Sequence, residues 1–145
     1  MRILILCLAF VLGLSFAPTA STQSFPPGPW RGVWTTLDGQ HEYQAELNFV
    51  TEMGGHVTGQ IRWMLVRSSQ RELIANIGQR GTEFIEGTFD QSTGALNIHG
   101  TRLDDPHHVI GMDDYRLIAS PNGHYIAGIT AGPDGDWQGR IDLVR

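Results

Sequence analysis

The densest group of side chains that could bind a metal lies between residues 102 and 114. Carboxylate oxygens and imidazole nitrogens are common ligands of divalent metals. Adjacent histidines in an extended chain point to opposite faces, so at most one of them serves a given site unless the loop is irregular. The alternative is a polar loop in which an Asp-Pro pair starts a turn. The candidate metal ligands, which would suit a metal-dependent hydrolase, are Asp104, Asp105, His107, His108 and Asp113.

A second candidate for chemistry is Glu83, in a segment that reads as a strand. It has the same parity as Ile85 and Phe89, so its carboxylate is expected to face the core. A buried carboxylate must be paired, and an arginine is one candidate partner. Glu86 has the opposite parity, so the two glutamates do not form an acid–base pair on one face.

Aromatic residues recur on the apolar face of several expected strands. Inside a barrel they could line a ligand cavity, with indole N–H groups available to the ligand. The alternative is a core that the same side chains fill, as small eight-stranded barrels allow. The candidate ligand-binding residues are Trp34, Trp63, Tyr115 and Trp137.

Motifs for covalent or cofactor chemistry are missing from the sequence. It contains no Gly-x-Ser-x-Gly elbow, no phosphate-binding loop and no dinucleotide fingerprint. All basic residues are arginines, so a lysine nucleophile is excluded, and the single cysteine, Cys7, lies in the apolar N-terminal run. We therefore assign no catalytic residue, predict no cofactor and lean towards a protein that is not an enzyme.

The net charge limits the classes of partner, and the N-terminal sequence indicates the compartment. A formal net charge of −5 argues against nucleic acid and anionic membrane surfaces. Arg2, an apolar run over 3–16 and small residues after it follow the plan of a secretory signal peptide, expected at 1–21. That run is too short to span a bilayer, so no membrane span is expected in the mature chain. A Pro-rich lead-in at 22–29 and a single domain at 30–145 follow, in a secreted or periplasmic protein.

Alternation with period two dominates the rest of the chain. Tyr43, Ala45, Leu47 and Phe49 share one face, which is typical of an antiparallel sheet with one buried side. Asp-Gly and Asn-Gly pairs mark hairpin turns between such runs, while 68–78 could be a helical turn or a short strand. We expect strands near 30–37, 41–51, 56–66, 82–90, 95–102, 113–119, 124–131 and 136–144.

Glycines interrupt the apolar face of these strands again and again. Glycine weakens a strand, so its repetition indicates strong coiling, with backbones that approach closely. The fold class is therefore all-β: an antiparallel up-and-down meander of about eight strands, closed or nearly closed into a small barrel. The glycines are Gly32, Gly59, Gly87, Gly100, Gly128 and Gly139.

The pattern is similar to the lipocalin and avidin class of small up-and-down barrels. The shared elements are the early Gly32-Val33-Trp34, the meander of hairpins and a closing strand that begins Trp137-Gln138-Gly139. The resemblance covers residues 30–144 as architecture and implies a closed barrel. Lipocalins usually carry a helix after the barrel, whereas the last segment here is expected to be a strand.

Three functional hypotheses follow from these observations. The first is an exported, non-catalytic barrel that binds a small apolar or amphipathic ligand. The second is an interaction module of the cell envelope or extracellular space, with a solid core and a protein partner. The third is the metal-dependent hydrolase that would use the loop at 104–114.

Overall fold

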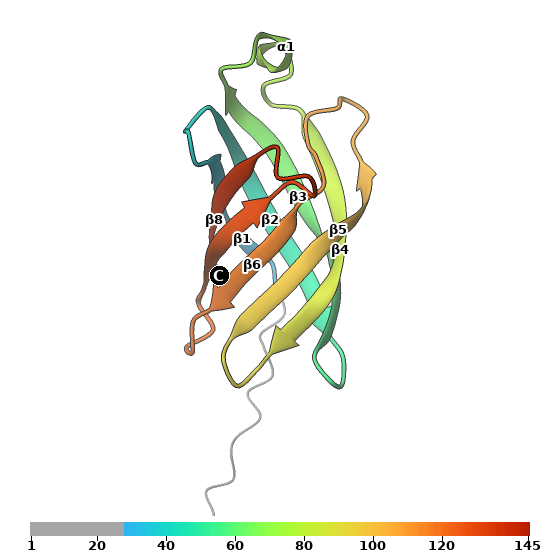
Figure 1. Ribbon diagram of the computed structural model, residues 1–145, viewed down its shortest axis with the longest axis vertical. Helices are drawn as coiled ribbons and strands as arrows, with labels where there is room; N and C mark the ends of the chain where they lie inside the picture. Colours follow the sequence, from blue (N-terminus) through green and yellow to red (C-terminus); the bar gives the residue numbers. More distant parts are fainter. Residues whose placement is uncertain (1–27) are drawn as a thin grey trace, which may run out of the picture.

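The structure is a computed structural model that describes residues 28–145, and the predicted signal peptide and most of the lead-in lie outside them. The described chain forms eight antiparallel strands that close into one barrel (Figure 1). The predicted all-β meander is therefore confirmed. The strands are β1 (Trp30–Thr36), β2 (His41–Thr51), β3 (His56–Ser68), β4 (Arg80–Asp90), β5 (Ala95–Asp104), β6 (Asp114–Ala119), β7 (Tyr125–Ala131) and β8 (Gln138–Val144).

The strands form where hydrophobic alternation predicts them. In β2, Tyr43, Ala45, Leu47 and Phe49 are buried while Gln44 is exposed. The ambiguous segment after β3 contains one short helix, α1 (Arg71–Ile74), at one end of the barrel (Figure 1). In the part of the chain that the structure describes, no helix is long and apolar enough to cross a membrane.

Closure comes from pairing between the first and last strands, with Trp34 of β1 opposite Ile141 of β8. At Gly32 a Cβ atom would collide with the backbone oxygen of Asp142, so the adjacent strands approach too closely for any side chain there. Gly128 meets the backbone oxygen of Arg116 in the same way. These close approaches confirm the coiling that the glycine pattern predicts.

Two of the mid-strand glycines make room for side chains instead. A Cβ at Gly100 would collide with the carboxylate of Glu83, and one at Gly139 would collide with the indole of Trp34. Both side chains belong to the same end of the barrel. The glycine pattern therefore marks the positions of two inward-pointing side chains as well as the coiling of the sheet.

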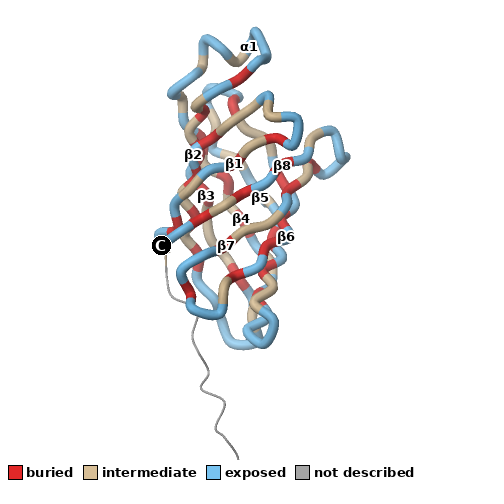
Figure 2. The backbone as a smooth tube through the Cα atoms, turned by 90° about the vertical axis from the view of Figure 1, so that its left-hand side faces the viewer, coloured by how far each residue is buried: buried red, intermediate tan, exposed pale blue. Residues whose placement is uncertain are grey.

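The two ends of the barrel interior differ. The end that carries the tight turns at 52–55, 91–94 and 120–124 is filled by fully buried side chains, among them Trp30, Val57, Leu96, Ile126 and Leu143. Buried positions continue along the inner face of every strand (Figure 2). The opposite end, which we call the α1 end, carries α1 and the loops at 37–40, 69–79, 105–113 and 132–137. There aromatic and polar residues join aliphatic ones on the inward face.

Candidate functional site

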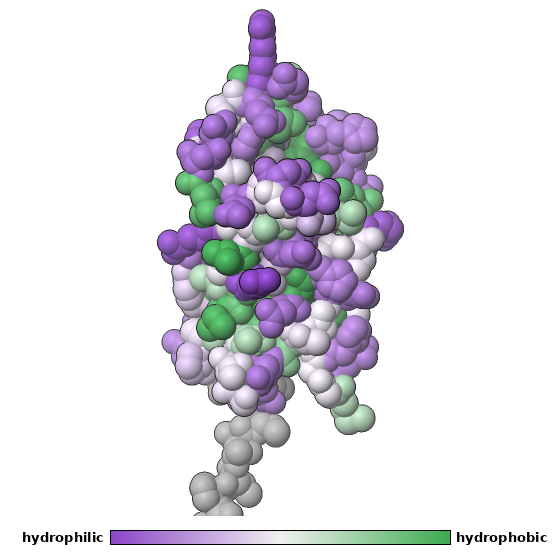
Figure 3. Space-filling model, in the orientation of Figure 1, coloured by the Kyte–Doolittle hydropathy of each residue, from purple (hydrophilic) through white to green (hydrophobic). Residues whose placement is uncertain are grey.

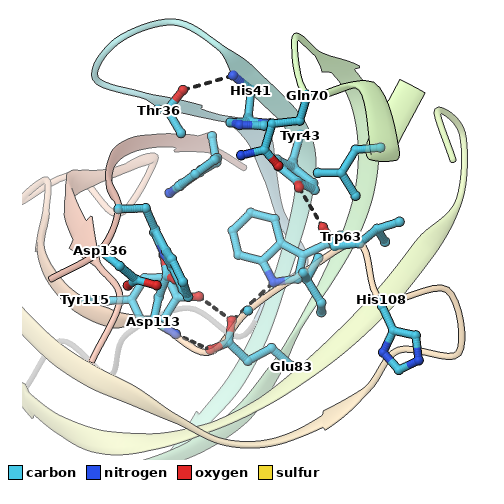
Figure 4. Close-up of a pocket in the computed structure, with 16 residues that line it drawn as sticks. Thr36, His41, Tyr43, Trp63, Gln70, Glu83, His108, Asp113, Tyr115 and Asp136 are labelled. Atoms are coloured by element: carbon cyan, nitrogen blue, oxygen red, sulfur yellow. Dashed lines mark hydrogen bonds between the residues drawn. The ribbon is translucent and has the colours of Figure 1, made fainter. Parts of the chain in front are cut away.

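A pocket of about 520 Å³ opens at the α1 end. Its walls come from inward-facing residues of the strands, and its mouth comes from α1 and the loops at 105–113 and 132–137 (Figure 4). This volume lies in the range of cavities that hold one small organic molecule. Its lining is Trp34, Thr36, His41, Tyr43, Trp63, Gln70, Leu73, Glu83, His108, Val109, Ile110, Gly111, Asp113, Tyr115, Asp136 and Trp137.

Three aromatic rings form one wall of the pocket. Trp34 and Tyr43 lie 5.4 Å apart between ring centroids, Tyr43 and Trp63 lie 6.1 Å apart, and Trp34 and Trp63 lie 6.3 Å apart. Each pair meets edge to face, at interplanar angles of 72–80°. Rings at such steep angles form corners, so a molecule in the pocket can meet ring faces from more than one side.

Glu83 lies on the floor of this pocket and is fully buried. Its Oε1 accepts a hydrogen bond from the backbone N–H of Asp113 at 2.9 Å. Its Oε2 accepts one from the Trp63 indole at 3.2 Å and one from the Tyr115 hydroxyl (Figure 4). Burial raises the pKa of Glu83 to about 7, although these three hydrogen bonds lower it.

The prediction that Glu83 faces the core is confirmed, but the candidate arginine partner is not found among its contacts within residues 28–145. The donors that meet the carboxylate within residues 28–145 are an indole, a hydroxyl and a backbone amide, all uncharged. These donors form hydrogen bonds with the carboxylate without cancelling its charge. The barrel interior therefore keeps a negative charge when Glu83 is ionised.

Asp113 forms a second buried carboxylate beside the first, and it is 7% exposed. Its Oδ1 accepts a hydrogen bond from the Trp137 indole at 2.6 Å, and its Oδ2 accepts one from the Thr130 hydroxyl at 2.6 Å. The Trp34 indole in turn donates to the Thr130 oxygen at 2.7 Å. Burial raises the pKa of Asp113 above its ordinary value, against the lowering effect of the two hydrogen bonds.

The indole N–H groups of the pocket are all used by the protein itself. Trp34 donates to Thr130, Trp63 donates to Glu83 and Trp137 donates to Asp113. The expectation that these groups are available to a ligand is therefore wrong. What they do is hold the three rings in place and fix both carboxylates at the base of the aromatic wall.

The mouth is held together by contacts between loops and strands. The Tyr43 hydroxyl donates to the backbone oxygen of Val109 at 2.6 Å, which anchors the loop at 105–113 over the pocket. Asp105 Oδ2 accepts a hydrogen bond from the backbone N–H of Ile110 at 2.8 Å within the same loop. Leu73 of α1 also lines the mouth and packs against the core.

The five candidate metal ligands are spread out by the fold. Asp113 faces the pocket and His108 lies at its rim, while Asp104 and His107 are exposed and Asp105 ties its own loop. His107 does not line the pocket, and both histidines lie in the loop between β5 and β6 instead of in a strand. Within residues 28–145, no three histidine, cysteine, aspartate or glutamate side chains gather closely enough to hold a metal ion.

The four candidate ligand-binding residues, Trp34, Trp63, Tyr115 and Trp137, all line the pocket. Trp137 lies in the loop before β8 instead of within a strand. Sequence reasoning misses Tyr43 and Thr130 and assigns Asp113 to the metal set. Strand alternation could have placed the first two inside the barrel, because Tyr43 shares the face of Leu47 and Thr130 shares the face of Ile126.

The chain matches no protein-family model, no curated protein and no solved structure. These comparisons do not support the lipocalin and avidin resemblance, and what the structure shows is a closed antiparallel barrel of eight strands within residues 28–145.

Proposed function

We propose that the protein is a non-catalytic barrel that binds one small amphipathic molecule in the pocket at the α1 end. The observation that carries this proposal is the contrast between the two ends of the interior. One end is filled by apolar side chains, whereas the other is an open aromatic pocket of about 520 Å³. A barrel of eight strands is just wide enough to hold one small ligand.

The chemistry of the lining supports an amphipathic ligand. Trp34, Tyr43 and Trp63 offer large apolar surfaces, while Glu83 and Asp113 place polar atoms at one side. Pockets that combine apolar walls with a few fixed polar groups commonly bind small molecules. The raised pKa of Glu83 in a cleft is a further feature that binding and active sites share.

Export belongs to the same proposal and rests on the signal-like N-terminus at 1–21. Removal of that segment would also remove Cys7, so the mature barrel would have no thiol. A ligand-binding barrel outside the cytoplasm would then be stabilised without a disulfide.

The other two hypotheses have less support from the geometry. An interaction module with a solid core does not explain the pocket, although Ile118 and Ile129 are each 57% exposed on the outer face. The face in Figure 3 is mainly hydrophilic, with apolar groups between the polar ones. The hypothesis of a metal-dependent hydrolase lacks support, because no group of three potential metal ligands is found among residues 28–145.

A titration with the neutral apolar dye 1-N-phenylnaphthylamine tests the proposal. The dye fluoresces strongly when it leaves water for an apolar cavity, and we expect saturable binding of about one molecule per chain. Replacing Leu73 with the larger tryptophan (Leu73→Trp) narrows the mouth and should weaken dye binding at least fivefold. Ile74→Trp is the matched control, because Ile74 is 51% exposed and does not line the pocket.

A folded protein that shows no saturable binding would contradict the proposal. So would equal weakening by Leu73→Trp and Ile74→Trp, because the dye would then be bound elsewhere. Thermal unfolding provides an independent check, since a ligand at a hundredfold excess over its Kd stabilises the folded state by about 2.7 kcal/mol.

A further inference from the structure

The deep part of the pocket offers a ligand mainly hydrogen-bond acceptors, whereas Gln70, His41 and His108 lie nearer its mouth. The indoles of Trp34, Trp63 and Trp137 and the hydroxyls of Tyr43 and Tyr115 all donate to acceptors within the protein. A carboxylate has about four acceptor positions on its two oxygens. The hydrogen bonds described above fill three positions of Glu83 and two of Asp113. The acceptor positions of Glu83 and Asp113 that remain unfilled can therefore bind a ligand that carries hydrogen-bond donors.

The charge of the pocket points the same way. Glu83, Asp113 and Asp136 line it, and no arginine does so among residues 28–145. The chain has no lysine. In the described part of the chain, the arginines that form ion pairs do so with Glu42, Glu46 and Asp142 on the outside of the barrel. The basic groups nearest the ligand space are the imidazoles of His41 and His108 at the rim.

The aromatic wall complements this negative floor. The π faces of tryptophan and tyrosine attract cations, and the interaction strengthens where water is excluded. Trp34, Tyr43 and Trp63 are each at most 8% exposed, so their faces meet a partly dehydrated space. Aromatic rings by themselves are a common feature of a buried core. Aromatic rings next to two buried carboxylates, however, match a ligand that is both apolar and positively charged.

We propose that the pocket selects an organic cation, an ammonium group on an apolar or aromatic body. The ammonium would contact the 7% exposed carboxylate of Asp113, while the apolar body lies against Trp34 and Trp63. Glu83, which is fully buried, acts as a positioning residue: it binds the backbone N–H of Asp113 and adds negative potential beneath the site. This inference rests on the proposed function, because it names the ligand class of the same pocket.

A pair of isosteric probes separates the charge from the shape. Phenyltrimethylammonium and tert-butylbenzene differ only in the central atom, a positively charged nitrogen or a neutral carbon. Calorimetric titration of the purified protein should give at least tenfold tighter binding of the cation, which corresponds to about 1.4 kcal/mol. Benzoate, an aromatic anion, should bind more weakly than both.

Variants locate the origin of the preference. Asp113→Asn should remove most of the ratio between the affinities for phenyltrimethylammonium and tert-butylbenzene, a ratio that is measured within the same variant. Asp114→Asn is the matched control, because this neighbouring carboxylate is exposed and does not line the pocket. Asp136→Asn at the exposed rim provides a second variant that does not disturb the buried network, and it should weaken cation binding by about two- to threefold.

Each result of these titrations has its own consequence. If tert-butylbenzene binds as tightly as phenyltrimethylammonium, the cation inference is overturned while the ligand-binding proposal stands. If the cation binds but Asp113→Asn and Asp136→Asn leave its affinity unchanged, the inference is also overturned, because the carboxylates would play no part. If neither probe binds, the inference fails, and the dye titration above decides separately whether the pocket binds anything.

Discussion

Glu83 is a buried carboxylate that meets only uncharged donors within the described chain, and this has a consequence for stability. Burial raises the pKa of Glu83 from 4.5 to about 7 in the folded state. Between these pH values the folded state holds a proton that the unfolded chain releases. The free energy of unfolding should therefore fall as pH rises through this window. The raised pKa of Asp113 acts with the same sign.

The first prediction concerns this pH dependence. In Glu83→Gln, the fall in the free energy of unfolding from pH 4.5 to about 7 should be smaller by about 3 kcal/mol, since one pKa unit corresponds to about 1.36 kcal/mol. Urea unfolding across that pH range measures it. Glu86→Gln is the control, because Glu86 lies on the same strand with its side chain 51% exposed. Parallel pH curves for the wild type and Glu83→Gln would contradict the burial of an ionisable Glu83.

The second prediction concerns Tyr115, whose hydroxyl donates to Glu83 and is buried. Tyr115→Phe keeps the ring but removes the hydroxyl that donates to the buried Glu83 carboxylate. One acceptor position of Glu83 then loses its donor, which should lower the free energy of unfolding by about 1–3 kcal/mol at neutral pH. Urea unfolding of both proteins gives the difference. Tyr125→Phe removes a hydroxyl that donates to Asp142 on the surface, and its effect should stay within about 0.5 kcal/mol. Equal effects of the two variants would contradict this account.

Some of these residues can be recognised from the sequence and others cannot. Parity along the strand places Glu83 inside, because alternation is a local property. Its partners Asp113 and Tyr115 lie 30 and 32 residues away, so no local pattern indicates them. For the same reason the sequence groups Asp113 with its neighbours along the chain, His107 and His108, instead of with the buried network.

At the scale of single elements, the glycines explain how the strands coil. Gly128 of β7 faces a backbone oxygen of the neighbouring strand, and backbone cannot move aside cheaply. At Gly81 of β4, by contrast, a Cβ atom would lie 2.7 Å from the flexible end of the Ile110 side chain. The two positions therefore differ in what a methyl group would displace.

The third prediction uses this difference. Gly128→Ala should destabilise the protein by about 1–3 kcal/mol, the usual cost of overpacking, while Gly81→Ala should cost clearly less because a side chain can shift. Thermal or urea unfolding compares the two. A Gly128→Ala variant as stable as the wild type would show that the strands do not approach there as closely as the structure describes.

Elements are the most predictable level of the structure. Strand positions follow from alternation and from turn residues, both of which act over a few neighbouring residues. The loops are less predictable, because their shape depends on the elements they cover. Trp137 illustrates this: the alternation predicts a strand position for it, but it lies in the loop before β8, where its indole reaches Asp113.

At the scale of the whole molecule, the barrel divides stability and binding between its two ends. The filled end contains fully buried apolar side chains, among them Trp30, Leu96 and Leu143, which contribute hydrophobic stabilisation. The α1 end contains buried carboxylates that reduce stability at neutral pH. Features that reduce stability are commonly retained where they serve a site.

The fourth prediction concerns the processed form of the chain. If residues 1–21 act as a cleaved signal, the protein isolated from its natural source should begin near residue 22 and lack Cys7. Intact mass and N-terminal sequencing measure this. A chain that retains Met1 after export would contradict cleavage.

The central claim is that a ligand enters the aromatic pocket at the α1 end, and the four indole N–H groups report on it directly. Trp34, Trp63 and Trp137 line the pocket, whereas Trp30 is buried at the filled end. Each indole N–H gives its own resonance in a two-dimensional ¹H–¹⁵N spectrum. Titration with phenyltrimethylammonium or 1-N-phenylnaphthylamine should shift the first three resonances and leave that of Trp30 in place. If neither compound shifts the three, or if Trp30 shifts equally, ligand binding in this pocket would be refuted.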